Sequence, residues 1–268
     1  MYGRYVALGD SQTEGLGDGD DVRGHRGWAD RLAEHLARTE PGLLYANLAV
    51  RGRRAVQIRD EQLPAALALR PGLATVMAGM NDLIRPGFDA AEVAAALEDM
   101  FAALTAAGTR VVSVTFPDIG ATVPLARPLR PRVIGLNTRI RAAAARHGVT
   151  LIDTFPLAFV SDARMWSGDR LHASPVGHAR IAAAVAHALD LPGSDGTWAD
   201  PFPPPAAISA WRAAATEARW LAAFAGPWIG RRLRGRSSGD GRTAKRPLPT
   251  PVIAGDPPVK GNVARRET

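Results

Sequence analysis

The stretch YVALGDS at residues 5–11 decides how the rest of the chain is read. Its first four residues form a short apolar run, which predicts a buried β-strand. The run ends in Gly9-Asp10-Ser11, and these turn-forming residues predict a loop directly after the strand. The sequence therefore places a serine hydroxyl at the end of a buried strand, close to the start of the chain.

Downstream of this strand, apolar runs alternate with segments of helical period as far as about residue 190. Further buried strands are predicted at 43–50, 73–78, 110–116 and 149–154, and helices at 28–38, 55–69, 90–107, 133–146 and 174–189. Five apolar strands that alternate with helices predict a parallel sheet covered on both faces. We therefore expect a three-layer α/β/α sandwich with a five-stranded parallel sheet as a domain over residues 1–195.

The composition changes beyond this domain. Prolines cluster at 201–205, and the Ala-rich stretch 206–234 carries Trp211, Trp220 and Phe224 at spacings typical of an amphipathic helix. We expect residues 196–235 to form a proline linker and a C-terminal helix that packs on or near the domain. Residues 236–268 are rich in Gly, Pro and Arg without periodicity, which predicts a disordered basic tail.

Charge and composition exclude several classes of function. The net charge of +7 comes from the C-terminal end, because residues 1–210 hold 21 Lys/Arg against 22 Asp/Glu. The arginines of the tail at 236–268 have no aromatic residues between them, so we expect no nucleic-acid partner. The chain has no cysteine, and its six histidines show no ligand spacing, so we expect neither a metal nor a cofactor. The first residues lack a secretion signal, which predicts a cytoplasmic protein.

Four short motifs fall where predicted strands end, and they supply the parts of an acyl-transfer site. Ser11 can act as nucleophile once His172 removes its proton, and Asp169 can hold the imidazole in one tautomer. A developing oxyanion needs fixed hydrogen-bond donors. The backbone N–H groups of Ser11 and Gly52 and the side-chain amide of Asn81 are the available set.

These motifs resemble those of the GDSL, or SGNH, hydrolase family, with Gln12 where a leucine often follows the serine. The resemblance covers residues 4–190 and implies the flavodoxin-like sheet order 2-1-3-4-5 of the SGNH hydrolase fold. It also implies Ser11, Gly52, Asn81, Asp169 and His172 as the site residues. The family includes esterases, thioesterases, lysophospholipases and carbohydrate deacetylases, so the resemblance predicts the mechanism better than the substrate.

We therefore expect a serine esterase that hydrolyses a small carboxylic ester through an acyl-enzyme: a short-chain acyl ester, a thioester or an acetylated sugar. The alternative is a hydrolase-like binding or membrane-surface module, with the basic aromatic C-terminal helix as a weak anchor. Asp10 and Asp82 are expected to brace their loops, and His178 to be structural. Trp166 fits a pocket wall and core packing equally well. The oligomeric state stays open.

Overall fold

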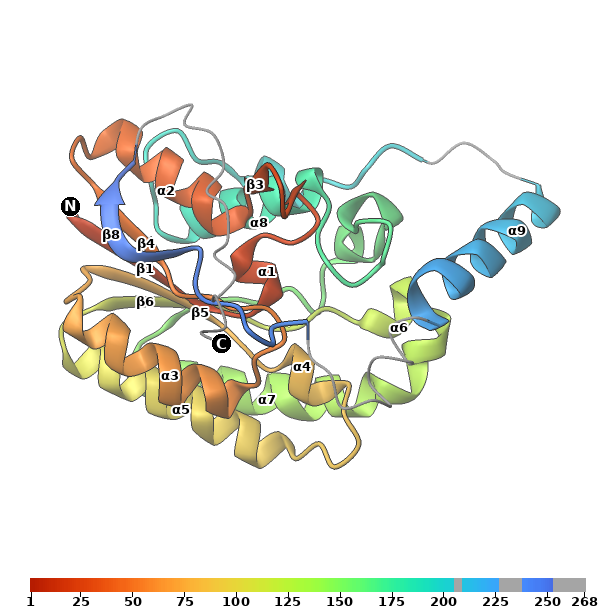
Figure 1. Cartoon of the computed structure of the whole chain (residues 1–268), viewed down its shortest axis with the longest axis horizontal. Coiled ribbons are helices and arrows are strands. Elements are labelled where there is room, and N and C mark those ends of the chain that lie inside the picture. Colours follow the sequence, from red (N-terminus) through yellow and green to blue (C-terminus); the bar gives the residue numbers. More distant parts are fainter. Residues whose placement is uncertain (205–208, 227–237, 253–268) are drawn as a thin grey trace, which may run out of the picture.

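The computed structural model describes residues 1–204, 209–226 and 238–252, and its centre is a parallel sheet (Figure 1). The parallel strands are β1 (Arg4–Gly9), β4 (Leu44–Asn47), β5 (Leu73–Met77), β6 (Arg110–Val114) and β7 (Thr150–Ile152). Their order across the sheet is β7-β6-β5-β1-β4, which is the predicted order 2-1-3-4-5. The three-layer α/β/α prediction is confirmed.

Helices cover both faces of this sheet, as Figure 1 shows. One face carries α2 (Trp28–Thr39) and α8 (Pro175–Ala188). The other carries α3 (Ala55–Ala68), α5 (Ala90–Ala106) and α7 (Arg130–His147). A separate apolar cluster fills the space between the sheet and each helical layer, because strands in the middle of such a sheet are buried on both sides.

Shorter elements follow the carboxyl ends of the strands. They include the helices α1 (Ser11–Glu14), α4 (Met80–Leu83) and α6 (Ile119–Thr122), and the hairpin of β2 (Gly19–Asp20) and β3 (Gly24–His25). Short 3₁₀ helices lie at Pro124–Leu129, Ala158–Ser161, Ala163–Met165 and Gly196–Ala199. Elements of two to six residues are too short to show a period in the sequence, so the pattern does not predict them.

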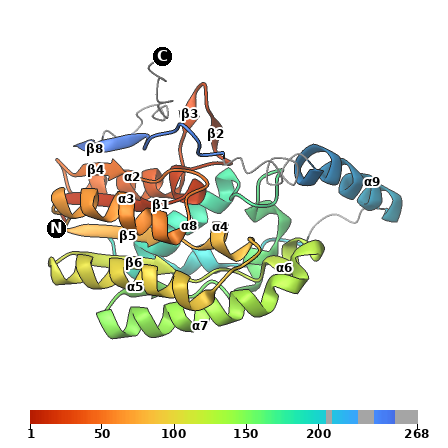
Figure 2. The same ribbon diagram turned by 60° about the horizontal axis from the view of Figure 1, so that its bottom comes forward.

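A sixth strand, β8 (Arg246–Pro251), pairs antiparallel with β4 at the edge of the sheet (Figure 2). The Val252 N–H donates to the Leu43 carbonyl at 3.3 Å. Just before the strand, the buried Lys245 ammonium donates to Asp30 Oδ2 at 2.6 Å and to the His25 carbonyl at 3.0 Å. The expected disorder of 236–268 is therefore wrong for this stretch, because the edge of β4 and these buried partners order it. Residues 236–237 and 253–268 lie outside the described residues.

The expected C-terminal helix is described over α9 (Ala210–Trp220) and a π-helical turn, η5 (Leu221–Ala225), and it projects to one side of the domain (Figures 1 and 2). The rest of the stretch 206–234 lies outside the described residues. Glu217 forms an ion pair of 2.8 Å with Arg170, and the Trp220 indole N–H donates to the Asp169 carbonyl at 3.2 Å. In the described part of the chain, no helix is long and apolar enough to span a bilayer.

Candidate active site

Ser11 is the first residue of α1, directly beyond the carboxyl end of β1. Asp10 begins this helix as its N-cap, because its side chain accepts a hydrogen bond of 3.2 Å from the Gln12 N–H. The strand and the turn meet closely at Gly9, where a Cβ atom would lie 2.7 Å from the Met77 carbonyl oxygen. A glycine is therefore required here, and the turn presents Ser11 at the strand-end edge of the sheet.

Asp169 and His172 are joined directly, as their spacing predicted. His172 Nδ1 donates to Asp169 Oδ2 at 2.6 Å, and Asp169 Oδ1 accepts from the backbone N–H groups of Leu171 and His172 at 2.9 and 3.0 Å. Burial alone would raise the pKa of Asp169, but these hydrogen bonds and the facing imidazole hold it well below its usual range. The carboxylate is therefore ionised at neutral pH and fixes the proton of His172 on Nδ1.

Asn81 lies beside the serine turn and is held at both of its amide hydrogens. Its Nδ2 donates to Asp10 Oδ2 at 3.0 Å and to the Arg53 carbonyl at 3.1 Å. Asp10 is buried, and this burial raises the pKa of its carboxyl to about 6 against the lowering effect of the Gln12 N–H and His172. The structure thus brings Asn81 and the residue preceding Ser11 into contact.

Gly52 lies in the loop after β4, with a left-handed backbone at φ +78° that favours glycine. The preceding residue, Arg51, fixes this loop to α1. Its N–H donates to Glu14 Oε2 at 2.7 Å, and its guanidinium pairs with Glu14 Oε1 at 2.6 Å. Both side chains are buried, so the ion pair ties the Gly52 loop to the serine turn. The sequence offered no signal for this pair.

Gln12 connects the serine turn to the histidine loop, a role that the sequence analysis missed. Its Oε1 accepts from the Ala173 N–H at 3.0 Å, and its Nε2 donates to the Leu171 carbonyl at 3.5 Å. Both partners flank His172. In the described chain, no hydrogen bond joins the Ser11 hydroxyl to His172 itself. The two loops therefore meet through Gln12.

The remaining predicted roles can be placed as well. Asp82 accepts from the Ala55 N–H at 3.0 Å, so it braces the start of α3 rather than the Asn81 turn. His178 is buried, accepts from the Trp28 N–H at 3.1 Å and donates to the Leu16 carbonyl at 2.9 Å. Burial lowers the pKa of His178 to about 4, so it is a neutral structural residue. The described residues contain no group of three or more His, Cys, Asp or Glu placed to hold a metal.

Comparison with known protein families agrees with this arrangement. The model of the GDSL-like Lipase/Acylhydrolase family matches residues 7–180, a range that contains every candidate site residue. The chain belongs to this family. Membership makes it an ester hydrolase. No curated protein sequence matches it.

Solved structures share the fold of this family member at low sequence identity. LAE5, an alpha/beta hydrolase enzyme from the metagenome of Lake Arreo, Spain, is 21% identical over 70% of this chain and 94% of its own, with a TM-score of 0.59. A catalytic mutant of Axe2, an acetylxylan esterase from Geobacillus stearothermophilus, is 18% identical over 72% and 96%, with a TM-score of 0.60. TesA is 25% identical over 69% and 97%, with a TM-score of 0.55. About 70% of this chain aligns with nearly the whole of each of these proteins.

Proposed function

We propose that the chain hydrolyses a carboxylic ester with Ser11 as nucleophile, His172 as general base and Asp169 as the carboxylate that orients the base. The observation that carries this proposal is the 2.6 Å hydrogen bond between Asp169 and His172 Nδ1, in a loop that Gln12 ties to the serine turn. With the proton fixed on Nδ1, the lone pair of His172 is on Nε2, where a base must hold it.

In the first half of the reaction, the Ser11 hydroxyl oxygen attacks the ester carbonyl carbon while His172 Nε2 takes its proton. The C–O bond to the alcohol then breaks, and His172 returns the proton to the leaving alkoxide. The products are the free alcohol and an acyl-enzyme. In the second half, water attacks the acyl carbon with His172 again as base, and the acid leaves as Ser11 regains its proton.

The oxyanion of each tetrahedral intermediate would be held by the Ser11 and Gly52 N–H groups and the Asn81 amide. Both hydrogens of that amide are engaged, with Asp10 and with the neutral Arg53 carbonyl. A negatively charged oxyanion is the stronger acceptor, so it would draw the hydrogen away from the Arg53 carbonyl. Such a donor contributes about 3–4 kcal/mol to stabilising the transition state.

The proposal is tested with p-nitrophenyl esters, comparing the wild-type protein with Ser11→Ala. We expect kcat/KM to fall at least about a thousandfold in the variant, because the nucleophile is lost. Ser194→Ala, which alters a serine in the turn after α8, is the matched control and should keep wild-type activity. A fluorophosphonate should label the wild type on Ser11 and leave Ser11→Ala unlabelled. Wild-type rates in Ser11→Ala, or a wild type that neither hydrolyses esters nor is labelled, would refute the assignment.

The mechanism serves a short-chain acyl ester, a thioester and an acetylated sugar equally, and it requires neither a metal nor a cofactor.

A second candidate function rests on the outer surface of α9 and η5, where Trp211, Leu221 and Phe224 are exposed. We propose that this surface contacts anionic membranes weakly. Co-sedimentation with phosphatidylserine vesicles should then fail for Trp211→Ala while esterase activity is kept. A wild type that stays in the supernatant would contradict the contact.

A further inference from the structure

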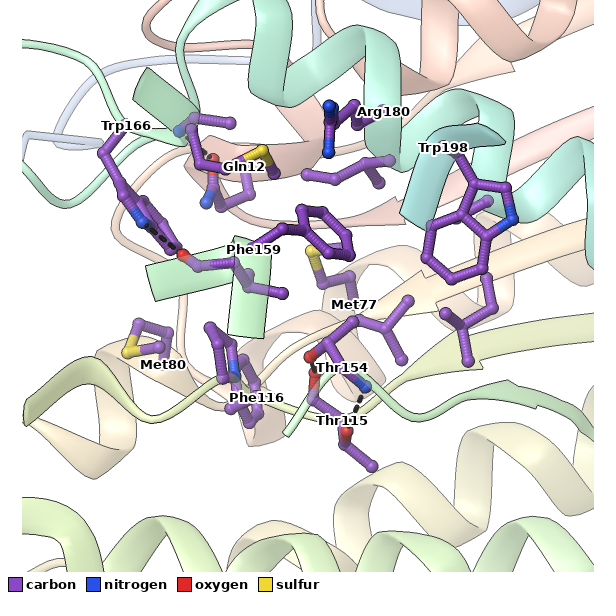
Figure 3. Close-up of a pocket in the computed structure, with 18 of the residues that line it drawn as sticks. Gln12, Met77, Met80, Thr115, Phe116, Thr154, Phe159, Trp166, Arg180 and Trp198 are labelled. Atoms are coloured by element: carbon purple, nitrogen blue, oxygen red, sulfur yellow. Dashed lines mark hydrogen bonds between the residues drawn. The ribbon is translucent and has the colours of Figure 1, made fainter. Parts of the chain in front are cut away.

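An apolar cavity of about 80 Å³ lies between the sheet and α8, beneath the 158–166 segment (Figure 3). Its floor is made by the carboxyl ends of three strands, with Met77, Val114 and Ile152. Ile181 and Ala184 of α8 and the ring of Phe159 close the other sides. Trp166 is also in the wall and packs against the cluster of Phe159, Val160 and Met165, so it both lines a pocket and takes part in apolar packing.

The cavity begins at the candidate active site. Asp10 and Gln12, which flank Ser11, are both part of its wall. Met80, the neighbour of Asn81, and Ala173, the neighbour of His172, complete that side. One end of the cavity is therefore built from the residues adjoining the proposed nucleophile, base and oxyanion donor.

The polar groups in the threonine part of the wall are already bonded within the protein. The Thr154 N–H donates to Thr115 Oγ1 at 2.9 Å, and the Thr115 hydroxyl donates to Asp153 at 2.7 Å. The Thr154 hydroxyl donates in turn to the Thr115 carbonyl at 2.5 Å. These groups leave no hydrogen free for a ligand hydroxyl in this part of the cavity.

Gln12 and Arg180, two other polar side chains in the wall, also have partners within the protein. The side-chain oxygen and nitrogen of Gln12 both form hydrogen bonds with the loop that carries His172. Arg180 donates to the Asp200 carbonyl and lies over the rings of Phe159 and Phe202 at 5.0 and 3.9 Å. The indole nitrogen of Trp198 is buried without a partner among the described residues, but it faces away from Phe159 (Figure 3). A sugar placed against the threonine part and the apolar floor of the cavity would lose hydrogen bonds to water that these groups do not replace, whereas an alkyl chain would lose none.

We propose that this cavity binds the acyl chain of the ester, and that the preferred acyl group is an unbranched aliphatic chain of about five to eight carbons. The proposal rests on the proposed function. The length follows from the volume, because one water-sized group needs about 10–15 Å³ of such a cavity. An acetyl group would leave it empty. Of the substrate classes considered above, the structure thus favours aliphatic acyl esters or thioesters over acetylated sugars.

The direct test is the chain-length profile of kcat/KM on p-nitrophenyl esters from acetate to decanoate. We expect a rise of about fourfold for each added methylene up to hexanoate or octanoate, followed by a fall. Ala184→Leu adds three carbons inside the cavity and should lower the octanoate-to-acetate ratio of kcat/KM about sixtyfold. Ala182→Leu is the control, because Ala182 is buried on the same helix but outside the cavity wall. A profile highest at acetate, or equal losses for both esters in Ala184→Leu, would overturn the proposal.

A binding measurement separates this proposal from the proposed function. Ser11→Ala should bind octanoate by calorimetry, and Ser11→Ala/Ala184→Leu should not. Octanoate binding in a protein that hydrolyses no ester would overturn the mechanism and support the cavity assignment. Hydrolysis of p-nitrophenyl acetate by a protein that does not bind octanoate would overturn the cavity assignment and support the mechanism. If Ala184→Leu does not fold, Ile181→Ala enlarges the cavity instead, and the optimum should move to a chain longer by one or two carbons; an unmoved optimum would count against the assignment.

Discussion

Replacing Asp10 with asparagine should change how the stability of the protein depends on pH. Burial raises the pKa of Asp10 from 3.8 to about 6 in the folded protein. Between about pH 4 and pH 6, the folded state therefore holds a proton that the unfolded state has released. Stability must fall as the pH rises through this window, and the whole cost of burying the charge is present above pH 6.

The size of this effect follows from the shift. About two pKa units at 1.36 kcal/mol each give a loss of about 3 kcal/mol between pH 4 and pH 7. The amide of the variant cannot ionise, so the free energy of unfolding of the wild type should fall by that amount relative to Asp10→Asn. Titrating groups that do not interact with Asp10, His178 among them, contribute equally to both proteins and cancel in the difference. Urea denaturation at half-unit intervals of pH measures it.

The difference in unfolding free energy between the two proteins is compared at two pH values. A hydrogen bond that the amide gains or loses contributes equally at both and therefore cancels. Ser11→Ala, which removes the neighbouring hydroxyl but no charge, is the control and should follow the wild-type pH dependence. Curves for wild type and Asp10→Asn that stay parallel within about 0.5 kcal/mol from pH 4 to pH 7 would show that Asp10 carries no buried charge, and the reasoning would fail.

Three further substitutions address the contacts around the site. Gln12→Leu removes the link between the serine turn and the histidine loop, so kcat should fall about tenfold while the melting temperature stays within a few degrees; an unchanged kcat would dismiss the link. Glu14→Gln leaves the guanidinium of Arg51 beside a neutral amide, with Asp21 at 2.9 Å as its remaining carboxylate partner, and urea denaturation should show a loss of about 2 kcal/mol. A loss below about 1 kcal/mol would mean that water reaches the pair. Trp220→Ala removes the hydrogen bond to the Asp169 carbonyl and should lower kcat severalfold at nearly constant stability; equal losses of activity and stability would make α9 a purely structural element.

The parallel sheet and the contact between Asp169 and His172 were predictable for a physical reason, whereas the order of the strands was implied by the family resemblance. Strands such as β1 and β5 are buried on both faces, so they appear as unbroken apolar runs. The carboxyl ends of parallel strands share one edge, which places the motifs after them together. Asp169 and His172 lie three residues apart in one loop, so their contact could be inferred without knowing the rest of the fold.

Other parts of the site depend on partners that are distant in the sequence. Gln12 forms hydrogen bonds with residues about 160 positions away, and Glu14 forms an ion pair with Arg51, which lies 37 positions away in the loop after β4. Nothing in the local pattern marks either contact. The strand β8 was missed because its composition is that of a disordered tail, and the order comes from the edge of β4 on which it lies. Sequence patterns predict the local conformation of a segment. The contacts of Gln12, the Glu14–Arg51 pair and the strand β8 depend instead on tertiary contacts with distant parts of the chain.

The composition of β8 also determines where the sheet stops growing. Alternate residues of a strand direct their N–H groups to the same side, and the Val252 N–H is directed at β4. Three residues of β8, Pro247, Pro249 and Pro251, have no N–H to donate, and the pairing of the strand with β4 is irregular between Tyr45 and Asn47. A second molecule that approached this edge would find an interrupted row of donors to pair with. A chain shortened to the hydrolase domain would lose that protection, expose the edge of β4 and tend to self-associate, so its solubility depends on a proline-rich strand that takes no part in the chemistry.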